Sequence, residues 1–342
     1  MSKTTKKADG LKKSSDLEAP PIERNLSSAR NRRLRLRAAW MYFIEEMTQQ
    51  DIAARLGVGR VTVVRLLSDA RERHEIKFSI QSDLPECVSL ERELEKRFHL
   101  TEAIVVPLNH PEADATKSIG ASTGLYLANF VRPGMNIGVG WGRTLIESLR
   151  YIPETPQADM SVISLLGGIT RVKRFNPSEF AWRFSSLFQA ECFLMPAPAI
   201  VDTPATRQAL IESCGLGEGF EHAKTLDAVL ISVGHLDPGG TAYRDGFVSD
   251  ELRLSMIKHG AVGEMLFHYF DAQGQVINHP IHDCVMAIPM STLCQVPERI
   301  MVAGGEEKAV AILGALRLLK PTVLITDEAA AAKVLDLDKV SA

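Results

Sequence analysis

The sequence predicts an α/β protein in two parts: a small helix-turn-helix head and a larger, doubly wound α/β domain with a mostly parallel sheet. Three observations lead to this prediction. Residues 48–71 have the pattern of two short helices joined by a glycine turn. Beyond residue 88, short apolar runs alternate with helical patterns. The chain of 342 residues is also too long for one typical domain.

Charge divides the chain near the same point. Residues 1–80 contain 17 Lys and Arg against 10 Asp and Glu, a net charge of +7, and the remainder has a net charge of −10. A basic head on an acidic body suits attraction to DNA phosphates at one end. We expect a disordered basic arm over 1–30, a DNA-binding domain over 31–80 and a second domain over 88–342.

The first helix of the head is expected over residues 34–46. Its apolar positions are Leu36, Ala39, Trp40 and Phe43. Aromatic side chains here could stack on bases, but packing in the small core of the head is the favoured interpretation for most of Trp40, Tyr42 and Phe43.

The second helix has clear start and stop signals. Thr48 is a suitable N-cap, and Asp51 three positions later can close a capping box. Ile52, Ala53 and Leu56 then form an apolar stripe. Gly57 suits a left-handed C-terminal position, and Val58 is expected to be buried in the turn.

The third helix, which begins near Gly59, is the predicted recognition helix. Val63, Leu66 and Leu67 fall on one face and are expected to face the core. The other face suits a major groove, where Arg reads guanine edges and small apolar groups meet thymine methyls. With two residues from the start of the second helix, the predicted DNA-binding set is Gln49, Gln50, Arg60, Val61, Thr62, Val64 and Arg65. An ordinary helical hairpin is the alternative.

Composition excludes several classes of protein. Apolar residues make up 45% and charged residues 24%, which is typical of a soluble globular protein. No apolar run reaches the length of a membrane span, and no hydrophobic segment follows the charged N-terminus, so we expect no secretory signal. The five Cys form no CxxC pair, which indicates reduced thiols in a cytoplasm. We expect neither a metal nor a cofactor, and interpret His235, His268, His279 and His282 as structural or surface residues.

The larger domain alternates predicted strands and helices. Strands are expected at 103–106, 135–139, 161–166, 192–195, 228–233, 285–288, 300–303 and 323–326. Helices are expected at 90–98, 119–130, 143–149, 177–189 and 306–318. This alternation predicts a doubly wound sheet. One exception is residues 265–277, where the DAQG segment at 271–274 predicts a hairpin.

Two glycine-rich loops lie where predicted strands lead into predicted helices, which is where α/β sheets bind ligands. The first, GVGWGRT, comprises Gly138, Gly140, Trp141, Gly142, Arg143 and Thr144, with Val139 between the first two glycines. Its glycines allow close approach of an anion, although it is neither a Walker P-loop nor a full dinucleotide motif. The second, AGGEEK, contributes Gly304, Gly305 and Lys308. A tight turn and a solvated helix start are the respective alternatives.

Acidic side chains complete the candidate ligand site. Glu264 and Asp271 are candidates because carboxylates pair well with sugar hydroxyls, and Asp245 and Gly246 are further polar candidates. Each alone is better explained as a turn or cap residue.

The chain resembles the SorC-type sugar-binding transcriptional regulators of bacteria from about residue 34 to the C-terminus. The resemblance rests on residues 47–72, 138–145, 260–274, 303–316 and 325–331. It implies a DNA-binding head, a sugar-binding effector and oligomerisation domain similar in fold to sugar-phosphate isomerases and deaminases, and a homodimer or homotetramer. It also implies that a sugar, sugar phosphate or sugar alcohol controls binding to an operator. Residues 38–50 resemble members that control polyol catabolism, such as erythritol regulators.

Two positions depart from the family pattern. Family members often have Ser or Thr where this chain has Gly140, so a hydroxyl that could hold a phosphate is missing, and they commonly have Ser in place of Gly59. A sugar-phosphate isomerase or deaminase with a DNA-binding head is the alternative function, although no catalytic constellation is recognisable. A structural DNA-binding protein without a ligand is a third alternative.

Overall fold

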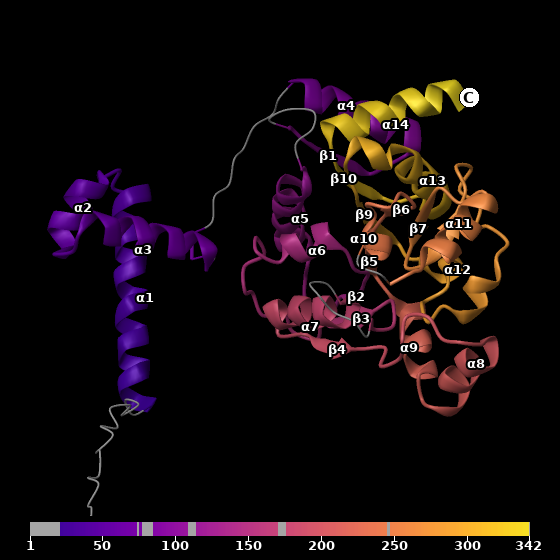
Figure 1. Cartoon of the computed structure of the whole chain (residues 1–342), viewed down its shortest axis with the longest axis horizontal. Helices are drawn as coiled ribbons and strands as arrows, with labels where there is room; N and C mark the ends of the chain where they lie inside the picture. Colours follow the sequence, from indigo (N-terminus) through magenta and orange to yellow (C-terminus); the bar gives the residue numbers. More distant parts are fainter. Residues whose placement is uncertain are drawn as a thin grey trace, which may run out of the picture. The chain divides into compact units, whose positions relative to one another are not determined.

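The computed structural model describes residues 21–73, 75–76, 85–108, 114–169, 176–244 and 247–341. The chain divides into two compact units, Met1–Ile80 and Gln81–Ala342, which Figure 1 shows in colours that follow the sequence. We call them the head and the effector domain.

The head consists of three helices, α1 (Pro21–Phe43), α2 (Gln49–Leu56) and α3 (Arg60–Glu72). The first begins within the arm that we expected to be disordered, so residues 21–30 are helical, whereas residues 1–20 lie outside the described residues. Pro loses no hydrogen bond at the first turn of a helix, and the Glu, Arg, Leu and Ala that follow favour helix.

Local side-chain chemistry defines the turn between α2 and α3. The hydroxyl of Thr48 accepts from the backbone N–H of Asp51 at 3.3 Å and donates to its carboxylate at 2.6 Å, as the capping box predicts. Gly57 ends α2 with a φ of 67°, and Gly59 is the N-cap of α3. Val58 is half-buried and packs against the core of the head. The predicted helix-turn-helix geometry is therefore present.

The core of the head is small. Its buried hydrophobic residues are Ala38, Ala39, Met41, Ile52, Ala53, Val63, Leu67 and Ala70. Tyr42 and Phe43 pack against this cluster, as expected. Leu36 and Trp40 do not, because the buried face of α1 passes through Ala38 and Met41; their exposed fractions are 36% and 59%. The expectation that most of Trp40, Tyr42 and Phe43 pack in the core therefore holds for Tyr42 and Phe43, and Trp40 is the exception.

A buried ion pair fixes the segment that follows α3 to α1. The guanidinium of Arg35 donates to both carboxylate oxygens of Glu75, at 2.5 and 2.6 Å, and both side chains are largely buried. The hydrogen bonds from Arg35 lower the pKa of Glu75. A bidentate pair of this kind is strong and directional.

The effector domain is built on a seven-stranded sheet in the order β1-β10-β9-β5-β2-β3-β4, and every neighbouring pair is parallel. The strands are β1 (Glu102–Val106), β2 (Asn136–Val139), β3 (Ser161–Ser164), β4 (Glu191–Phe193), β5 (Ala228–Ser232), β9 (Glu298–Val302) and β10 (Val323–Asp327). Seven of the eight predicted strands are therefore present. Residues 285–288 instead form isolated antiparallel bridges, Leu166 with Ala287 and Ile200 with Val285.

The helices of this domain are α4 (Pro85–Phe98), α5 (Thr116–Phe130), α6 (Arg143–Ser148), α7 (Pro177–Phe188), α8 (Pro204–Ser213), α9 (Gly217–His222), α10 (Thr241–Arg244), α11 (Asp250–Lys258), α12 (Met290–Leu293), α13 (Ala309–Leu319) and α14 (Glu328–Ser341). The 3₁₀ turns are η1 (Ala223–Thr225), η2 (Pro280–Cys284) and η3 (Glu306–Lys308). The five predicted helices correspond to α4, α5, α6, α7 and η3 with α13.

Helices cover both faces of the sheet, as a doubly wound fold requires. On one face, α5, α6 and α7 pack on residues such as Ile137 and Leu230. On the other, α4, α13 and α14 pack on residues such as Val229 and Met301 (Figure 1). Alternate residues of a strand therefore enter different cores, which explains why the strands are almost continuously apolar.

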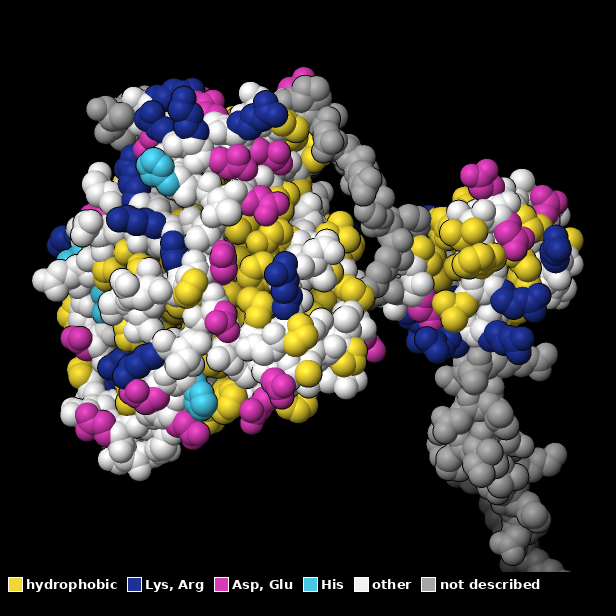
Figure 2. Space-filling view, turned by 180° about the vertical axis from the view of Figure 1, so that it is seen from behind, with side chains coloured by type: hydrophobic (Ala, Val, Ile, Leu, Met, Phe, Trp, Pro, Cys, Tyr) yellow, Lys and Arg dark blue, Asp and Glu magenta, His cyan; other side chains and the backbone are white. Residues whose placement is uncertain are grey.

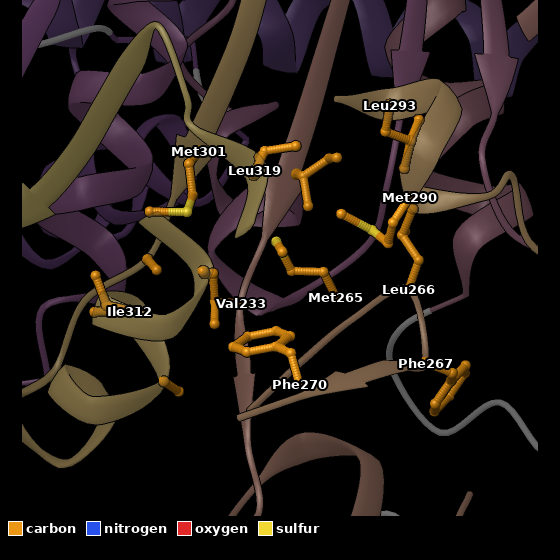
Figure 3. Packing of buried hydrophobic residues seen from close by; sticks show 14 of the residues in the cluster. Val233, Met265, Leu266, Phe267, Phe270, Met290, Leu293, Met301, Ile312 and Leu319 are labelled. Carbon is orange, nitrogen blue, oxygen red and sulfur yellow. The ribbon is translucent and has the colours of Figure 1, made fainter. Parts of the chain in front are cut away.

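A small antiparallel sheet, β6 (Gly234–His235), β7 (Gly263–Met265) and β8 (His268–Phe270), packs on the second core. Figure 3 shows Met265 and Phe270 of this sheet lying beside Val233, at the end of β5. The predicted turn at 271–274 is present, with an antiparallel bridge from Phe270 to Val276. A second turn, between β7 and β8, was not predicted, because Leu266 and Phe267 adopt positive φ without any glycine.

Candidate effector pocket and DNA-binding face

The order of the strands creates a crevice beside β2. From β2 the chain continues to β3 and β4 on one side, whereas β5, β9 and β10 lie on the other. The loops that leave β2 and β5 therefore diverge, which is the arrangement at which α/β sheets bind ligands. A pocket lies at this point. It is lined by Trp141, Gly142, Arg143, Thr144, Ser232, Val233, Gly234, His235, Ala242, Glu264 and Lys308.

Two cations from different loops meet in this pocket. Arg143 is the first residue of α6, after the β2 loop, and Lys308 ends η3, after β9. Burial and the positive charge of Arg143 lower the pKa of Lys308. Among the described residues, no carboxylate lies within ion-pair distance of either cation. The pocket therefore presents positive charge that an anionic group can neutralise.

Glu264 of β7 supplies a carboxyl group to the same pocket. The side chain is buried, and burial raises its pKa to about 7. The backbone N–H of Phe267 donates to the carboxylate at 2.9 Å, and this hydrogen bond and the charge of Lys308 both oppose the rise. Near neutral pH this carboxyl can either accept or donate a hydrogen bond to a ligand hydroxyl.

His235 also lines the pocket, which makes it a further candidate for a ligand contact. Burial, and then the charge of Lys308, lower its pKa. Its Nδ1 is buried and has no hydrogen-bond partner among the described residues. A buried polar atom without a partner in a pocket-lining residue calls for an explanation, and a ligand contact would supply one.

The structure brings together six of the eleven predicted effector residues: Trp141, Gly142, Arg143, Thr144, Glu264 and Lys308. Gly138 and Gly140 do not line the pocket. Gly138 lies within β2 against Leu165 and Leu226, and the N–H of Gly140 donates to the carbonyl of Leu230 at 2.9 Å. A Cβ at position 140 would lie 3.2 Å from Leu266 Cδ2 and 3.3 Å from the carbonyl oxygen of Leu230.

Gly304 and Gly305 serve packing and internal hydrogen bonding instead of lining the pocket. The N–H of Gly305 donates to Asp327 Oδ2 at 2.6 Å, and Asp327 Oδ1 accepts from the N–H of Ala330 at 3.0 Å. A Cβ at Gly304 would clash with Asp327 Oδ2 and with Ile119 Cδ1. The amide of Gly305, which we expected to be free for a ligand, is thus already satisfied.

Asp271 is also outside the pocket. Its carboxylate accepts from the backbone N–H groups of Gln273 and Gln275, at 3.0 and 2.8 Å, and so stabilises the turn. The alternative interpretation as a turn residue is correct here. Asp245 and Gly246 lie outside the described residues.

Sequence reasoning missed Ser232, Val233, Gly234 and Ala242. The first three end or follow β5, so the rule that ligands bind at the carboxyl ends of strands could have identified them. Ala242 lies in α10, which had no signal in the sequence.

The candidate DNA-binding face has the expected orientation. Val63 and Leu67 of α3 are buried, and Leu66 packs partly against the core. On the opposite side, Arg60, Val61, Thr62, Val64 and Arg65 are all exposed, as is Gln50 of α2, whereas Gln49 is half-buried. Figure 2 shows hydrophobic side chains beside Lys and Arg side chains on one face of the head.

Other sites are not apparent in the described part of the chain. No group of three or more His, Cys, Asp and Glu residues there is placed to hold a metal ion. Within the same residues, no helix has the length and apolar character needed to span a membrane. All five cysteines are free thiols.

A helix-turn-helix head joined to an α/β domain with a polar pocket at its switch point defines a class of protein, the ligand-responsive transcriptional regulator. Residues 82–336 match the family described as "Putative sugar-binding domain". Because this match covers most of the chain, the chain belongs to that family.

Three relatives place it more closely. The erythritol catabolism regulatory protein EryD of Brucella abortus is 29% identical over 86% of this chain and 94% of its own length. The transcriptional regulator LsrR of Klebsiella pneumoniae is 30% identical, over 88% and 92%. The crystal structure of the full-length sorbitol operon regulator SorC from Klebsiella pneumoniae matches with a TM-score of 0.70 and 27% identity, over 89% of this chain and 98% of that one. The chain is therefore a SorC-type transcriptional regulator, and not a sugar-phosphate isomerase or deaminase.

Proposed function

We propose that the chain binds a double-stranded DNA operator of a carbohydrate or polyol catabolic operon, and that a small ligand in the pocket controls this binding. One observation above all supports the proposal that a small ligand binds in the pocket. Arg143 and Lys308, from loops far apart in sequence, meet in one pocket with the buried carboxyl of Glu264. A pocket of fixed polar groups at a switch point is the usual form of a small-molecule site.

The side chains of the pocket suit a carbohydrate with an anionic group. The two cations favour a phosphate or a carboxylate, because either would neutralise a partly desolvated positive charge. Thr144, Ser232 and Glu264 can exchange hydrogen bonds with sugar or polyol hydroxyls. A sugar phosphate or a phosphorylated polyol could both pair with the two cations and form these hydrogen bonds. An uncharged sugar or polyol could form only the hydrogen bonds.

On the DNA side, α3 is the proposed recognition helix. Arg60 and Arg65 are exposed without an ion-pair partner among the described residues. Val61 and Val64 have exposed fractions of 76% and 45%, which is costly in water and suits contact with thymine methyl groups. Two heads in a homodimer or homotetramer would read half-sites separated by whole turns of DNA.

Control of DNA binding follows from linkage. If the ligand binds one arrangement of the subunits more tightly, it shifts the population toward that arrangement and changes the free energy of operator binding by at most that preference. No new contact between ligand and DNA is needed.

The first experiment identifies the ligand. A thermal-shift panel of sugars, polyols and their phosphates, with erythritol among them because of the Brucella abortus relative, should contain at least one stabilising compound. That compound should then change the affinity of the full chain for its own promoter DNA in fluorescence anisotropy. A compound that stabilises the protein without changing DNA affinity would count against the proposed control.

The second experiment tests α3. Arg65→Ala should weaken binding to promoter DNA by about 1–3 kcal/mol while the thermal shift by the ligand stays unchanged. Arg92→Ala, which removes an equal charge from the exposed surface of α4, is the matched control and should have little effect. Equal losses in the two variants would show that general charge, and not α3, determines DNA affinity.

A further inference from the structure

The head exposes a line of three large hydrophobic side chains on α1. Leu36, Trp40 and Ile44 have exposed fractions of 36%, 59% and 61%. They are spaced four residues apart, so they lie one above another on the same side of the helix. Ile44 follows the last residue of α1, but its N–H still donates to the carbonyl of Trp40 at 2.9 Å, which keeps it on the helical line. We call these three residues the α1 stripe.

Neither the core of the head nor the proposed DNA contact explains this stripe. The buried residues of α1 are Ala38, Ala39 and Met41, which lie on its other side. At the Ile44 end of the stripe, binding of DNA phosphates is also disfavoured, because the exposed carboxylates Glu45 and Glu46 lie directly beside Ile44. Exposed Trp, Leu and Ile in one line indicate a surface that another apolar surface covers.

The charges beside the stripe differ at its two ends. Arg33 and Arg37 are exposed near Leu36, and a shallow groove beside Trp40 is lined by Arg32, Arg33, Leu36, Arg37 and Trp40. Glu45 and Glu46 are exposed at the other end. Among the described residues, Arg33, Arg37, Glu45 and Glu46 form no ion pair with one another or with other residues.

We propose that the α1 stripe is an interface with a second copy of this chain, in which two α1 helices pair antiparallel about a two-fold axis at Trp40. In this pairing Leu36 of each copy meets Ile44 of the other, and the two Trp40 side chains meet at the axis. The basic end of each helix then faces the acidic end of its partner, and Glu45 and Glu46 approach the arginine-lined groove. A parallel pairing would place like charges together. A two-fold interface must be complementary to itself, and the antiparallel pairing satisfies this condition.

Three side chains per copy form a small interface, well below the roughly 800 Å² per partner of a stable complex. The stripe is therefore expected to pair only within an oligomer that already holds two heads near each other, where the effective concentration is high. Its role is to fix the relative orientation of two recognition helices.

Cysteine cross-linking of the full chain tests the pairing. In a Cys214→Ser background, which removes the exposed native thiol, Trp40→Cys should cross-link to a covalent dimer with a short bismaleimide. Arg33→Cys should not, because two copies of position 33 lie about 20 Å apart along an antiparallel pair. Mixed Leu36→Cys and Ile44→Cys chains should cross-link with each other.

Several outcomes would overturn the proposal. Efficient cross-linking through Arg33→Cys would indicate a parallel pair. The absence of dimer with Trp40→Cys would mean that the stripe is covered by something else, such as the chain's own effector domain or another protein.

A second experiment measures DNA binding by the variant Trp40→Glu, which would place two negative charges at the two-fold axis of the proposed pair. It should lower affinity for promoter DNA at least tenfold, whereas affinity for a DNA fragment with a single half-site, and the ligand-induced thermal shift, should change less than twofold. Trp182→Glu, at a 61% exposed Trp of the effector domain, is the matched control. Equal loss on both DNA fragments with Trp40→Glu would contradict the proposal, because it would indicate damage to the head itself. Far-UV circular dichroism checks that the helices of the variant remain folded.

Discussion

The two glycine-rich loops of the effector domain both lie between a strand and a helix, but they have different roles. The loop after β2 turns Trp141, Gly142, Arg143 and Thr144 into the pocket. The loop after β9 contributes only Lys308, because Asp327 binds the N–H of Gly305 and encloses Gly304. A glycine in a strand-to-helix loop can therefore leave space for a ligand or for a neighbouring side chain. Only the packing around the glycine distinguishes these two roles.

We expect the largest effect on stability from adding a methyl group at Gly304, in the loop after β9. Gly304→Ala places a Cβ against Asp327 and Ile119, and Asp327 cannot move freely because it accepts from Gly305 and Ala330. We expect a loss of about 3 kcal/mol in the free energy of unfolding of the effector domain, measured by urea denaturation. Gly239→Ala is the control, because its Cβ would have open space, and should be nearly neutral. Similar stability of both variants would contradict the packing role.

The second largest effect concerns how stability depends on pH through the buried carboxyl of Glu264. Burial raises the pKa of Glu264 from the ordinary 4.5 to about 7, so between these values the folded state binds more protons than the unfolded state. The stability contributed by the protonated carboxyl is therefore present below pH 4.5 and is lost as pH rises toward 7, by up to about 3 kcal/mol.

The comparison with Glu264→Gln isolates this contribution from those of other titrating groups. In melting curves without ligand, the wild-type chain should lose more stability than the variant between pH 5 and pH 7.5. Parallel stability curves for the two proteins would mean that Glu264 titrates normally.

The smallest effect is expected on ligand affinity when Lys308 is replaced. Lys308→Met should weaken ligand binding about tenfold to a hundredfold, the range of a charge-assisted hydrogen bond, while promoter affinity without ligand stays the same. It should also raise the pKa of Glu264 further, because Lys308 lowers it. Lys333→Met, at an exposed position of α14, is the matched control. An unaltered ligand titration, measured by calorimetry, would remove Lys308 from the site.

Local chemistry made much of the molecule predictable. Thr48, Asp51 and Gly57 define the turn of the head through contacts within a few residues, so their roles could be inferred from spacing. The apolar runs of the parallel sheet were equally clear, because both faces are covered. By contrast, the turn at Leu266 and Phe267 has no glycine or asparagine, and only its tertiary packing holds it.

The pocket was only partly predictable for a related reason. Arg143 and Thr144 lie in a recognisable loop, whereas Ser232 and His235 come together with them through the order of the strands, which no local pattern specifies. The exposure of Trp40 is similar, because the rotation of α1 depends on which of its sides α3 packs against.

The dual attachment of Asp327 has a practical consequence for engineering biosensors from this chain. Because one carboxylate joins the β9 loop to the start of α14 and leaves no room for a Cβ at Gly304, randomising Gly304 or Gly305 would destabilise the effector domain. Libraries that seek a new inducer should instead vary Thr144, Ser232, His235 and Ala242, which line the pocket.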